Sequence, residues 1–160
     1  MYQLDFPSPL GMVEITSTKS AVTAVLFVDR EETIHRQTSE TPAVLKHCYE
    51  QLIQYFNGER TKFNVPYEMY GTEFQKNVWT ALTTVPFAKT ESYKDIAMKI
   101  GNEKAVRAVG TTNGKNPISI IVPCHRIIGA NGKLTGYTGG LWRKEWLLEH
   151  EQKWQKNRTD

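Results

Sequence analysis

The sequence predicts an α+β protein built from two small domains, and three observations support this. Apolar residues alternate with polar ones near the N-terminus, they recur at helical spacing further on, and the sign of the charge changes near residue 70. Residues 1–70 hold 6 Lys and Arg against 9 Asp and Glu, a net charge of −3. Residues 71–160 hold 14 against 8, a net charge of +6. A length of 160 residues allows two such domains, and we divide the chain into 1–70 and 71–160.

The composition excludes several classes of protein. Apolar residues make up 39% and charged residues 23% of the chain, which are ordinary values for a globular protein. No apolar run approaches the roughly 18 residues that cross a membrane. The first residues lack the basic and apolar segments of a secretory signal. We therefore expect a cytoplasmic protein without membrane contact.

The acidic half is expected to form a small sheet covered by one helix. Its β-branched and alternating segments, separated by turns rich in Pro, Gly and Ser, predict strands at residues 2–6, 12–16 and 21–28. Residues 29–41 are polar and without periodicity, which is typical of a loop. Thr41 as N-cap and Pro42 at the first helical position then predict a helix that continues to Phe56.

The helix of the acidic half carries the first of two cysteines, Cys48. Cys48 lies on the apolar face of that helix, which favours a small buried side chain over a reactive thiol. His47 is its neighbour, but no set of Cys and His in this half has the spacing of metal ligands. We expect no metal and no cofactor.

The basic half begins with helical periodicity. A first helix is predicted over 73–85 and ends before Pro86. Ser92 opens a second helix, with Asp95 as its capping-box partner. After the turn at Gly101 and Asn102, a third helix is predicted over 103–111. Two helices joined by a short turn that contains Gly form the helix-turn-helix pattern of DNA-binding proteins.

The rest of the basic half surrounds the second cysteine. The β-branched run 118–122 predicts a buried strand, and it leads into Pro123, Cys124, His125 and Arg126. A final amphipathic helix is predicted over 141–151. The polar tail 152–160 is expected to fray.

Cys124 is the strongest candidate for chemistry. A thiol near His or Arg has a lowered pKa, and the thiolate is the nucleophile. Adjacent residues on a regular strand point to opposite faces, so Cys124 and His125 cooperate only if the strand breaks there. Pro123 favours such a break. A reactive nucleophile and an inert cysteine at a strand end both stay open on these features alone.

Four other residues have two interpretations each. Tyr93 is a core residue of its helix or a site residue. Arg107, flanked by small residues, is a surface cation or a side chain that reaches into a DNA groove. Glu151 is a solvated acid or the partner that orients His125. Asn116 is a turn residue or a polar contact in the site.

At Pro123-Cys124-His125-Arg126 the sequence resembles a known family, the O6-alkylguanine-DNA alkyltransferases, also called methylated-DNA–protein-cysteine methyltransferases. The overall pattern resembles the bacterial constitutive members. Further motifs fall in the family's order and spacing, namely Ser92-Tyr93, Lys104 to Gly110, Asn116 to Ile120, Gly136 to Gly140 and Lys144 to Leu148. The resemblance covers the basic half closely and the acidic half more loosely. It implies an N-terminal ribonuclease-H-like domain followed by a winged helix-turn-helix domain.

The resemblance also implies an activity and a role for each site residue. The protein would repair O6-alkylguanine in double-stranded DNA, and to a lesser extent O4-alkylthymine, by moving the alkyl group irreversibly to Cys124 in a single turnover. His125, acting through a water and held by Glu151, would deprotonate Cys124. Tyr93 would give a proton to the departing guanine, and Asn116 would brace the strand break.

The remaining roles concern DNA, which the resemblance implies is bound through the minor groove. We expect this protein to be a monomer. Arg107 would fill the space left by the flipped nucleotide. Lys94, Asn102 and Ala130 occupy positions implied to contact DNA. Ala105 and Gly110 would let the recognition helix lie in the minor groove. Tyr137 and Thr138 would border the base pocket. The alternatives from other classes are a DNA-binding module with an inert Cys124 and a Cys–His hydrolase.

Overall fold

The structure, a computed structural model, describes residues 1–158. It divides into two compact units, Met1–Met69 and Tyr70–Asp160. A small sheet with one helix makes up the first unit, and helices dominate the second. The predicted α+β fold class is therefore confirmed.

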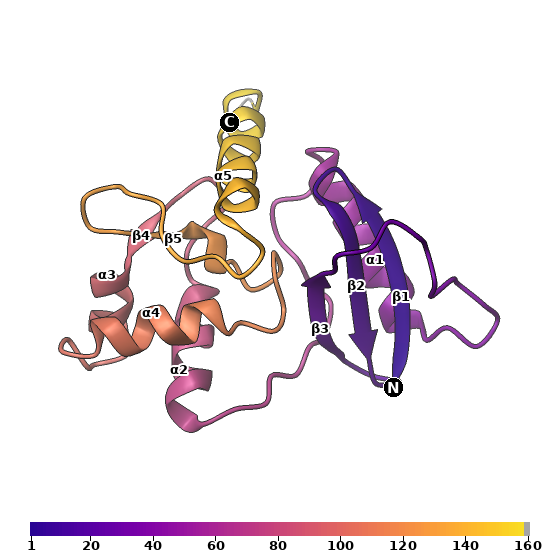
Figure 1. The fold of residues 1–160 in the computed structure, drawn as a ribbon, viewed down its shortest axis with the longest axis horizontal. Coiled ribbons are helices and arrows are strands. Elements are labelled where there is room, and N and C mark those ends of the chain that lie inside the picture. Colours follow the sequence, from indigo (N-terminus) through magenta and orange to yellow (C-terminus); the bar gives the residue numbers. More distant parts are fainter. Residues whose placement is uncertain (159–160) are drawn as a thin grey trace. The chain divides into compact units, whose positions relative to one another are not determined.

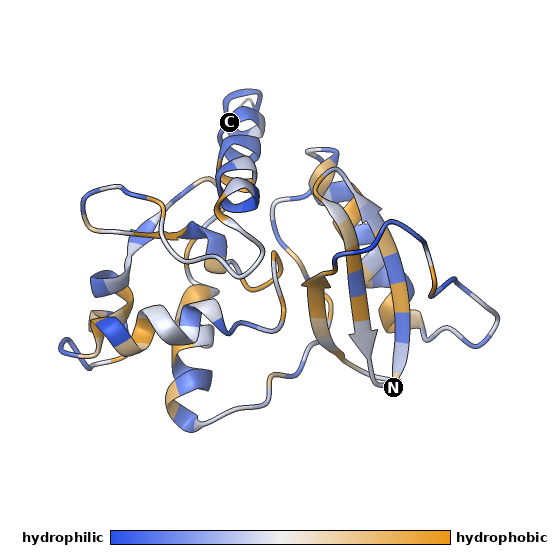
Figure 2. Ribbon diagram, viewed as in Figure 1, coloured by the Kyte–Doolittle hydropathy of each residue, from blue (hydrophilic) through white to orange (hydrophobic). Residues whose placement is uncertain are grey.

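The first unit is built on a three-stranded antiparallel sheet in the order β1-β2-β3 (Figure 1). Its strands are β1 (Tyr2–Ser8), β2 (Gly11–Ser17) and β3 (Val22–Phe27), within two residues of the predicted bounds. Leu4 pairs with Ile15 and Phe6 with Val13, so these four side chains share one face. Figure 2 shows the resulting alternation of apolar and polar residues along the strands.

Helix α1 (Ala43–Phe56) covers the apolar face of this sheet. The Phe6 ring lies 5.2 Å from the Tyr49 ring and 5.7 Å from the Phe56 ring, centroid to centroid. Cys48, on the buried face of α1, is fully buried, and burial raises the pKa of its thiol to about 12. A thiol with that pKa stays protonated near neutral pH, which supports its interpretation as inert.

The predicted start of α1 is wrong by one residue. Pro42, rather than Thr41, occupies the N-cap position, and it supplies no side-chain cap. The Thr41 hydroxyl oxygen instead accepts a hydrogen bond from the Thr38 N–H at 2.8 Å. The cause is local competition, because a threonine hydroxyl bonds nearby backbone as readily as it caps a helix.

Beyond α1, the connector to the second unit pairs with the first residue of β3, at the free edge of the sheet. The Val22 N–H donates to the Pro66 carbonyl and the Glu68 N–H donates to the Val22 carbonyl, both at 2.9 Å. The connector is therefore tied to the first unit at Val22, on the edge strand of the sheet.

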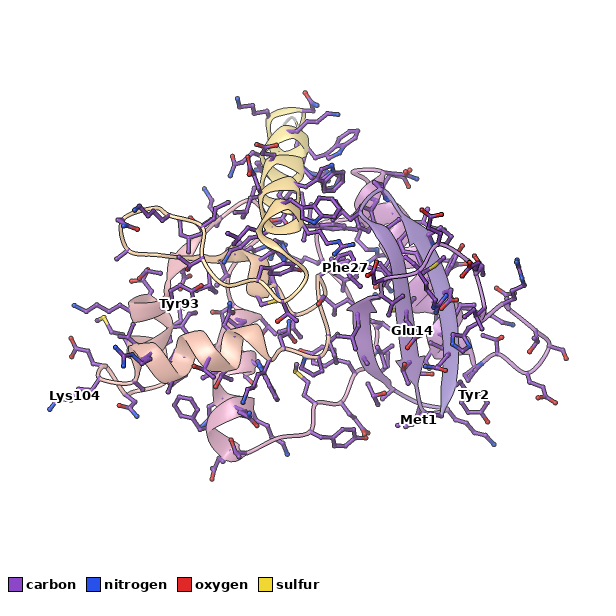
Figure 3. All side chains as sticks on the ribbon, viewed as in Figure 1. Met1, Tyr2, Glu14, Phe27, Tyr93 and Lys104 are labelled. Carbon is purple, nitrogen blue, oxygen red and sulfur yellow. The ribbon has the colours of Figure 1, made fainter. Side chains whose placement is uncertain are left out.

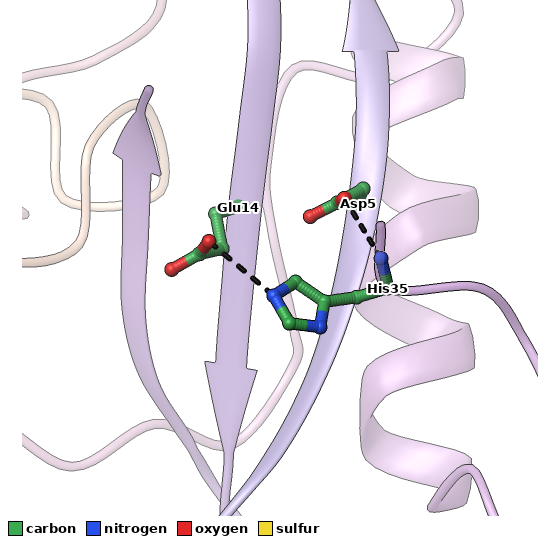
Figure 4. A group of neighbouring side chains, drawn as sticks. All are labelled: Asp5, Glu14 and His35. Carbon is green, nitrogen blue, oxygen red and sulfur yellow. Dashed lines mark hydrogen bonds and ion pairs between the residues drawn. The ribbon is translucent and has the colours of Figure 1, made fainter. Parts of the chain in front are cut away.

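A polar cluster occupies the other face of the sheet (Figure 4). Asp5 accepts two hydrogen bonds from the Arg30 guanidinium, at 2.7 and 2.8 Å, and further ones from the N–H groups of Ile34 and His35 at 2.8 and 2.9 Å. Arg30 also donates to Glu14 at 3.0 Å. These bonds hold the loop 29–41 against the sheet.

The same cluster gathers three groups that can ligate metals. Ligand atoms of Asp5, Glu14 and His35 lie within 4.8 Å of one another. Both carboxylates are bonded to Arg30, so a cation would have to displace that guanidinium. We interpret the cluster as an ion-pair network that fixes a loop.

Replacing Asp5 with asparagine is expected to lower the free energy of unfolding by about 2 kcal/mol at neutral pH. Burial alone would raise the pKa of Asp5, but hydrogen bonds from Arg30, His35 and Ile34 lower it to about 2. A carboxyl group whose pKa is lower in the folded than in the unfolded chain stabilises the fold at pH values above its unfolded pKa. That contribution is lost as the pH falls toward about 2.

Denaturant unfolding of wild type and Asp5→Asn across this pH range measures the effect. The difference between the two proteins should shrink as the pH falls. The exposed Glu31, replaced by glutamine, is the matched control and should differ little from wild type. A difference that stays constant at acid pH would contradict the assignment.

The second unit is mainly helical (Figure 1). Its elements are α2 (Glu73–Leu82), β4 (Glu91–Ser92), α3 (Tyr93–Lys99), α4 (Val106–Gly114), the 3-10 turn η1 (Cys124–Arg126), β5 (Ile127–Ile128) and α5 (Leu141–Lys156). Strands β4 and β5 pair in parallel. Among the residues described, no helix has the length and apolar character needed to cross a bilayer.

Helices α3 and α4 form the predicted helix-turn-helix. Ser92 is the N-cap of α3, and Ser92 and Asp95 exchange the two hydrogen bonds of a capping box, as predicted. Gly101 follows with φ of +76°, a conformation that glycine adopts without steric cost. Residues 103 and 104 form a turn and Ala105 is the N-cap, so α4 begins at Val106, three residues later than predicted.

Other predicted boundaries also differ from the structure. α2 ends at Leu82, and residues 83–85 continue as tight turns with i→i−3 bonds. α5 extends to Lys156 through most of the segment expected to fray. The end of that predicted tail, 159–160, lies outside the described residues.

The predicted strand 118–122 is wrong. The segment is a buried turn in which the Val122 N–H donates to the Ile118 carbonyl at 3.1 Å. Ile120, with φ of +71°, reverses the direction of the chain there. A run of apolar β-branched residues predicts that the segment is buried, and the structure confirms this. Such a run does not by itself predict that the backbone pairs with another strand.

Candidate active site

The buried turn 118–122 leads directly to Cys124, the first residue of η1. Cys124 is only 4% exposed. Because the backbone coils here instead of running as a strand, the alternation that would separate Cys124 from His125 does not apply. The break that the sequence analysis required is present.

Asn116 holds this turn together. Its Nδ2 donates to the carbonyls of Ile118 and Val122, at 3.2 and 2.8 Å, and its Oδ1 accepts from the Ile118 N–H at 3.0 Å. The left-handed conformation of Ile120 is costly for a β-branched residue. The three hydrogen bonds of Asn116 therefore stabilise a strained backbone just before the nucleophile.

A buried ion network lies behind the cysteine. His125 Nε2 lies 2.7 Å from Glu151 Oε2, and both residues are fully buried. Arg126 donates to the same carboxylate from Nε at 2.9 Å and from a terminal nitrogen at 3.1 Å. The Ala88 N–H adds a further bond at 3.1 Å. Glu151 thus joins α5 to η1 and to the segment after α2.

The network sets the protonation of its members. Burial alone would raise the pKa of Glu151, but His125 and Arg126 hold it well below its usual range. Burial lowers the pKa of His125 despite the attraction of Glu151, so the neutral ring is favoured. A ring that donates from Nε2 to a carboxylate leaves Nδ1 as an acceptor. Within residues 1–158, His125 Nδ1 has no hydrogen-bond partner.

Lys144 is a site residue that the sequence analysis missed. It is fully buried, and its Nζ donates to the carbonyls of Ile127 at 2.5 Å and Thr135 at 2.7 Å. Burial lowers the pKa of Lys144 to about 8. The spacing in the sequence could have indicated its burial. Lys144 stands at helical spacing from Leu147 and Glu151, so all three lie on one face of α5, which is the buried face.

Opposing effects act on the pKa of Cys124. Burial raises it, whereas a hydrogen bond from Asn116 and the charge of Lys144 lower it. The net direction is upward. The thiol therefore needs a base to become a nucleophile at neutral pH, and His125 is the adjacent one.

Tyr93 and the loop before α5 meet at Thr135. The Tyr93 hydroxyl lies 3.2 Å from the Thr135 carbonyl and 2.9 Å from its Oγ1. Lys144 Nζ bonds that same carbonyl and lies 5.9 Å from the centre of the Tyr93 ring. In the same loop Tyr137 is buried, which raises its pKa well above the usual value, and the exposed Thr138 donates to the Gly114 carbonyl.

The residues expected to contact DNA lie on the surface of the helix-turn-helix and of the loop after β5. Four of them are exposed, namely Lys94, Asn102, Arg107 and Ala130. Ala105 and Gly110 are partly exposed. A Cβ atom at Gly110 would lie 3.7 Å from the Tyr93 ring, an ordinary van der Waals distance, so the packing of α4 on α3 does not itself require glycine there. In Figure 3, Tyr93 begins α3 and Lys104 projects from the turn before α4.

Fold and site together define a class: a helix-turn-helix protein with a buried cysteine beside a His–Glu pair. Comparison with known proteins agrees. Residues 1–69 match the 6-O-methylguanine DNA methyltransferase ribonuclease-like domain, and residues 73–153 match the DNA-binding domain of the same family. A methylated-DNA–protein-cysteine methyltransferase of Mycolicibacterium paratuberculosis is 46% identical, over 91% of this chain and 89% of its own length. One of Methanosarcina acetivorans is also 46% identical, over 94% and 98%.

Solved structures agree as well. The Mycobacterium tuberculosis OGT in complex with DNA superposes with a TM-score of 0.86 at 44% identity, over 96% of this chain and 94% of that one. The chain therefore belongs to the methylated-DNA–protein-cysteine methyltransferase family. The predicted family and enzyme class are confirmed.

Proposed function

We propose that this protein is a single-turnover DNA-repair enzyme that accepts the alkyl group of O6-alkylguanine on Cys124. O4-alkylthymine is the poorer substrate. One observation carries the proposal: Cys124 adjoins His125, whose Nε2 is held by Glu151 while Nδ1 has no partner within residues 1–158. An imidazole that a carboxylate orients, next to the cysteine in the chain, supports activation of that thiol as a nucleophile.

The residues divide the reaction as follows. His125 Nδ1 takes the thiol proton through a water, and Glu151 stabilises the imidazolium. The thiolate of Cys124 attacks the alkyl carbon, a carbon–sulfur bond forms, and the carbon–oxygen bond breaks with its electron pair moving to the guanine. Tyr93 gives a proton to the guanine as it leaves. The proton on His125 returns to Tyr93 through solvent.

The stable thioether explains why each molecule acts once. No group in this sequence of steps regenerates the thiol. Asn116 keeps the backbone turn that presents Cys124. No metal or cofactor is required, because each proton has an acceptor or a donor among these side chains.

DNA binding follows from the basic half of the chain. The thiol is buried, so the damaged base has to leave the stack to reach it. We assign to Arg107, which enters from the minor groove, the space that the flipped base leaves in the stack. Lys94, Asn102 and Ala130 contact the DNA, Ala105 and Gly110 let α4 lie in the minor groove, and Tyr137 and Thr138 border the base. The net charge of +6 supports binding without sequence readout. A cytoplasmic, monomeric protein remains our prediction.

Intact mass spectrometry tests the proposal. After incubation with duplex DNA that contains O6-methylguanine, the protein should gain the mass of one methylene group, located on the Cys124 peptide. The gain should stop at one equivalent. An unchanged mass indicates a DNA-binding module with an inert cysteine, and continued turnover indicates a hydrolase. Either result would overturn the proposal.

A further inference from the structure

Asn113 is a buried polar residue beside Cys124 to which the mechanism assigns no role. It lies on α4, the helix that carries Arg107, and is 1% exposed. Its Nδ2 donates to the Cys124 carbonyl at 3.3 Å. A carbonyl only accepts, so this bond fixes which end of the carboxamide carries the nitrogen.

The carboxamide oxygen of Asn113, Oδ1, points to a further role for this residue. Asn113 Oδ1 is buried and has no hydrogen-bond partner among the described residues. A buried polar atom without a partner costs free energy, and native proteins rarely keep one without a reason. Because Nδ2 is anchored to the residue that bears the nucleophile, Oδ1 is held in the neighbourhood of Cys124.

A damaged base supplies a suitable donor. To react, the alkyl carbon of the damaged base must reach the sulfur of Cys124. This brings the Watson–Crick pairing edge of the base close to Cys124 and therefore to Asn113. Alkylation at O6 removes the N1 hydrogen of guanine, so the 2-amino group is the donor left on that edge. O4-alkylthymine presents no N–H there, since its N3 also loses the hydrogen.

We propose that Asn113 is a specificity-determining residue whose Oδ1 accepts a hydrogen bond from the 2-amino group of the extruded guanine. Asn113 then favours O6-alkylguanine over O4-alkylthymine at the cost of an unpaired acceptor in the free protein. The inference rests on the proposed alkyl transfer and adds a determinant of its substrate range.

A substrate without the 2-amino group isolates this contact. Duplexes that differ only in carrying O6-methylguanine or O6-methylhypoxanthine are reacted with wild type and with Asn113→Leu, and single-turnover rates of Cys124 methylation are compared. In wild type the loss of the amino group should slow transfer about three- to tenfold, the range of one net hydrogen bond. In Asn113→Leu the two substrates should react at rates within about twofold of each other.

The control separates recognition from stability. Val109→Ala removes apolar volume from the same buried face of α4, so it should destabilise the protein while keeping the wild-type ratio of the two rates. If Asn113→Leu does not fold, Asn113→Ala gives the same comparison.

The outcomes are distinct. An unchanged ratio in the Asn113 variants, with both substrates slowed equally, would show that Asn113 only braces the Cys124 backbone and would overturn the inference. Failure of wild type to methylate Cys124 with either duplex would refute the proposed function instead.

Discussion

Replacement of Cys124 by alanine is expected to abolish alkyl transfer while leaving affinity for duplex DNA nearly unchanged. The Cys124 side chain is small and buried. The residues expected to contact DNA lie elsewhere, on the surface of the helix-turn-helix and of the loop after β5. The other cysteine, Cys48, is fully buried in the first unit with a pKa of about 12, so it cannot take over.

Two measurements check this expectation. Intact mass after incubation with O6-methylguanine DNA reports transfer, and fluorescence anisotropy with a labelled duplex at fixed salt concentration reports affinity. Cys48→Ala is the matched control and should be methylated at the wild-type rate. Methylation that persists in Cys124→Ala would remove Cys124 from its proposed role.

The second large effect is expected at Glu151. Glutamine in its place should lower the free energy of unfolding by about 3–5 kcal/mol, because removing one partner of a buried ion pair leaves the other charge uncompensated. Arg126, which is 6% exposed, would lose its charged partner, and His125 would lose the carboxylate that orients it. Transfer should therefore slow as well, without being abolished.

Stability and rate have to be measured separately. Denaturant unfolding gives the first, and single-turnover methylation at a temperature where the variant is fully folded gives the second. Glu149→Gln, at an exposed position on the same helix, should change neither. Wild-type stability in Glu151→Gln would contradict the role of the carboxylate as the centre of the network.

Local sequence signals predicted the elements whose determinants are local. The capping box at Ser92 and Asp95 involves residues three apart, and it begins α3 as expected. The turn 118–122 was predicted wrongly as a strand, since its conformation depends on Asn116, whose side chain bonds backbone groups up to six residues away. The residues 118–122 by themselves do not indicate the hydrogen bond from Asn116, which lies outside that segment.

The candidate site divides in the same way. Cys124, His125, Asn116, Tyr93 and Glu151 were singled out from residue type and spacing together with the family resemblance. Arg126 and Lys144 were not given roles, although both stand within motifs that were recognised. Their importance comes from full or nearly full burial, which depends on which segments pack over them.

The sequence alone determined the two-domain α+β class, the helix-turn-helix and the cysteine on which the chemistry depends. Only the tertiary structure decided how that cysteine is tuned. Glu151 reaches His125 across 26 positions, and Lys144 reaches the Ile127 carbonyl across 17. Desolvation and charge pairing act through space, so the pKa values of Cys124, His125 and Glu151 depend on contacts that no local pattern of residues encodes.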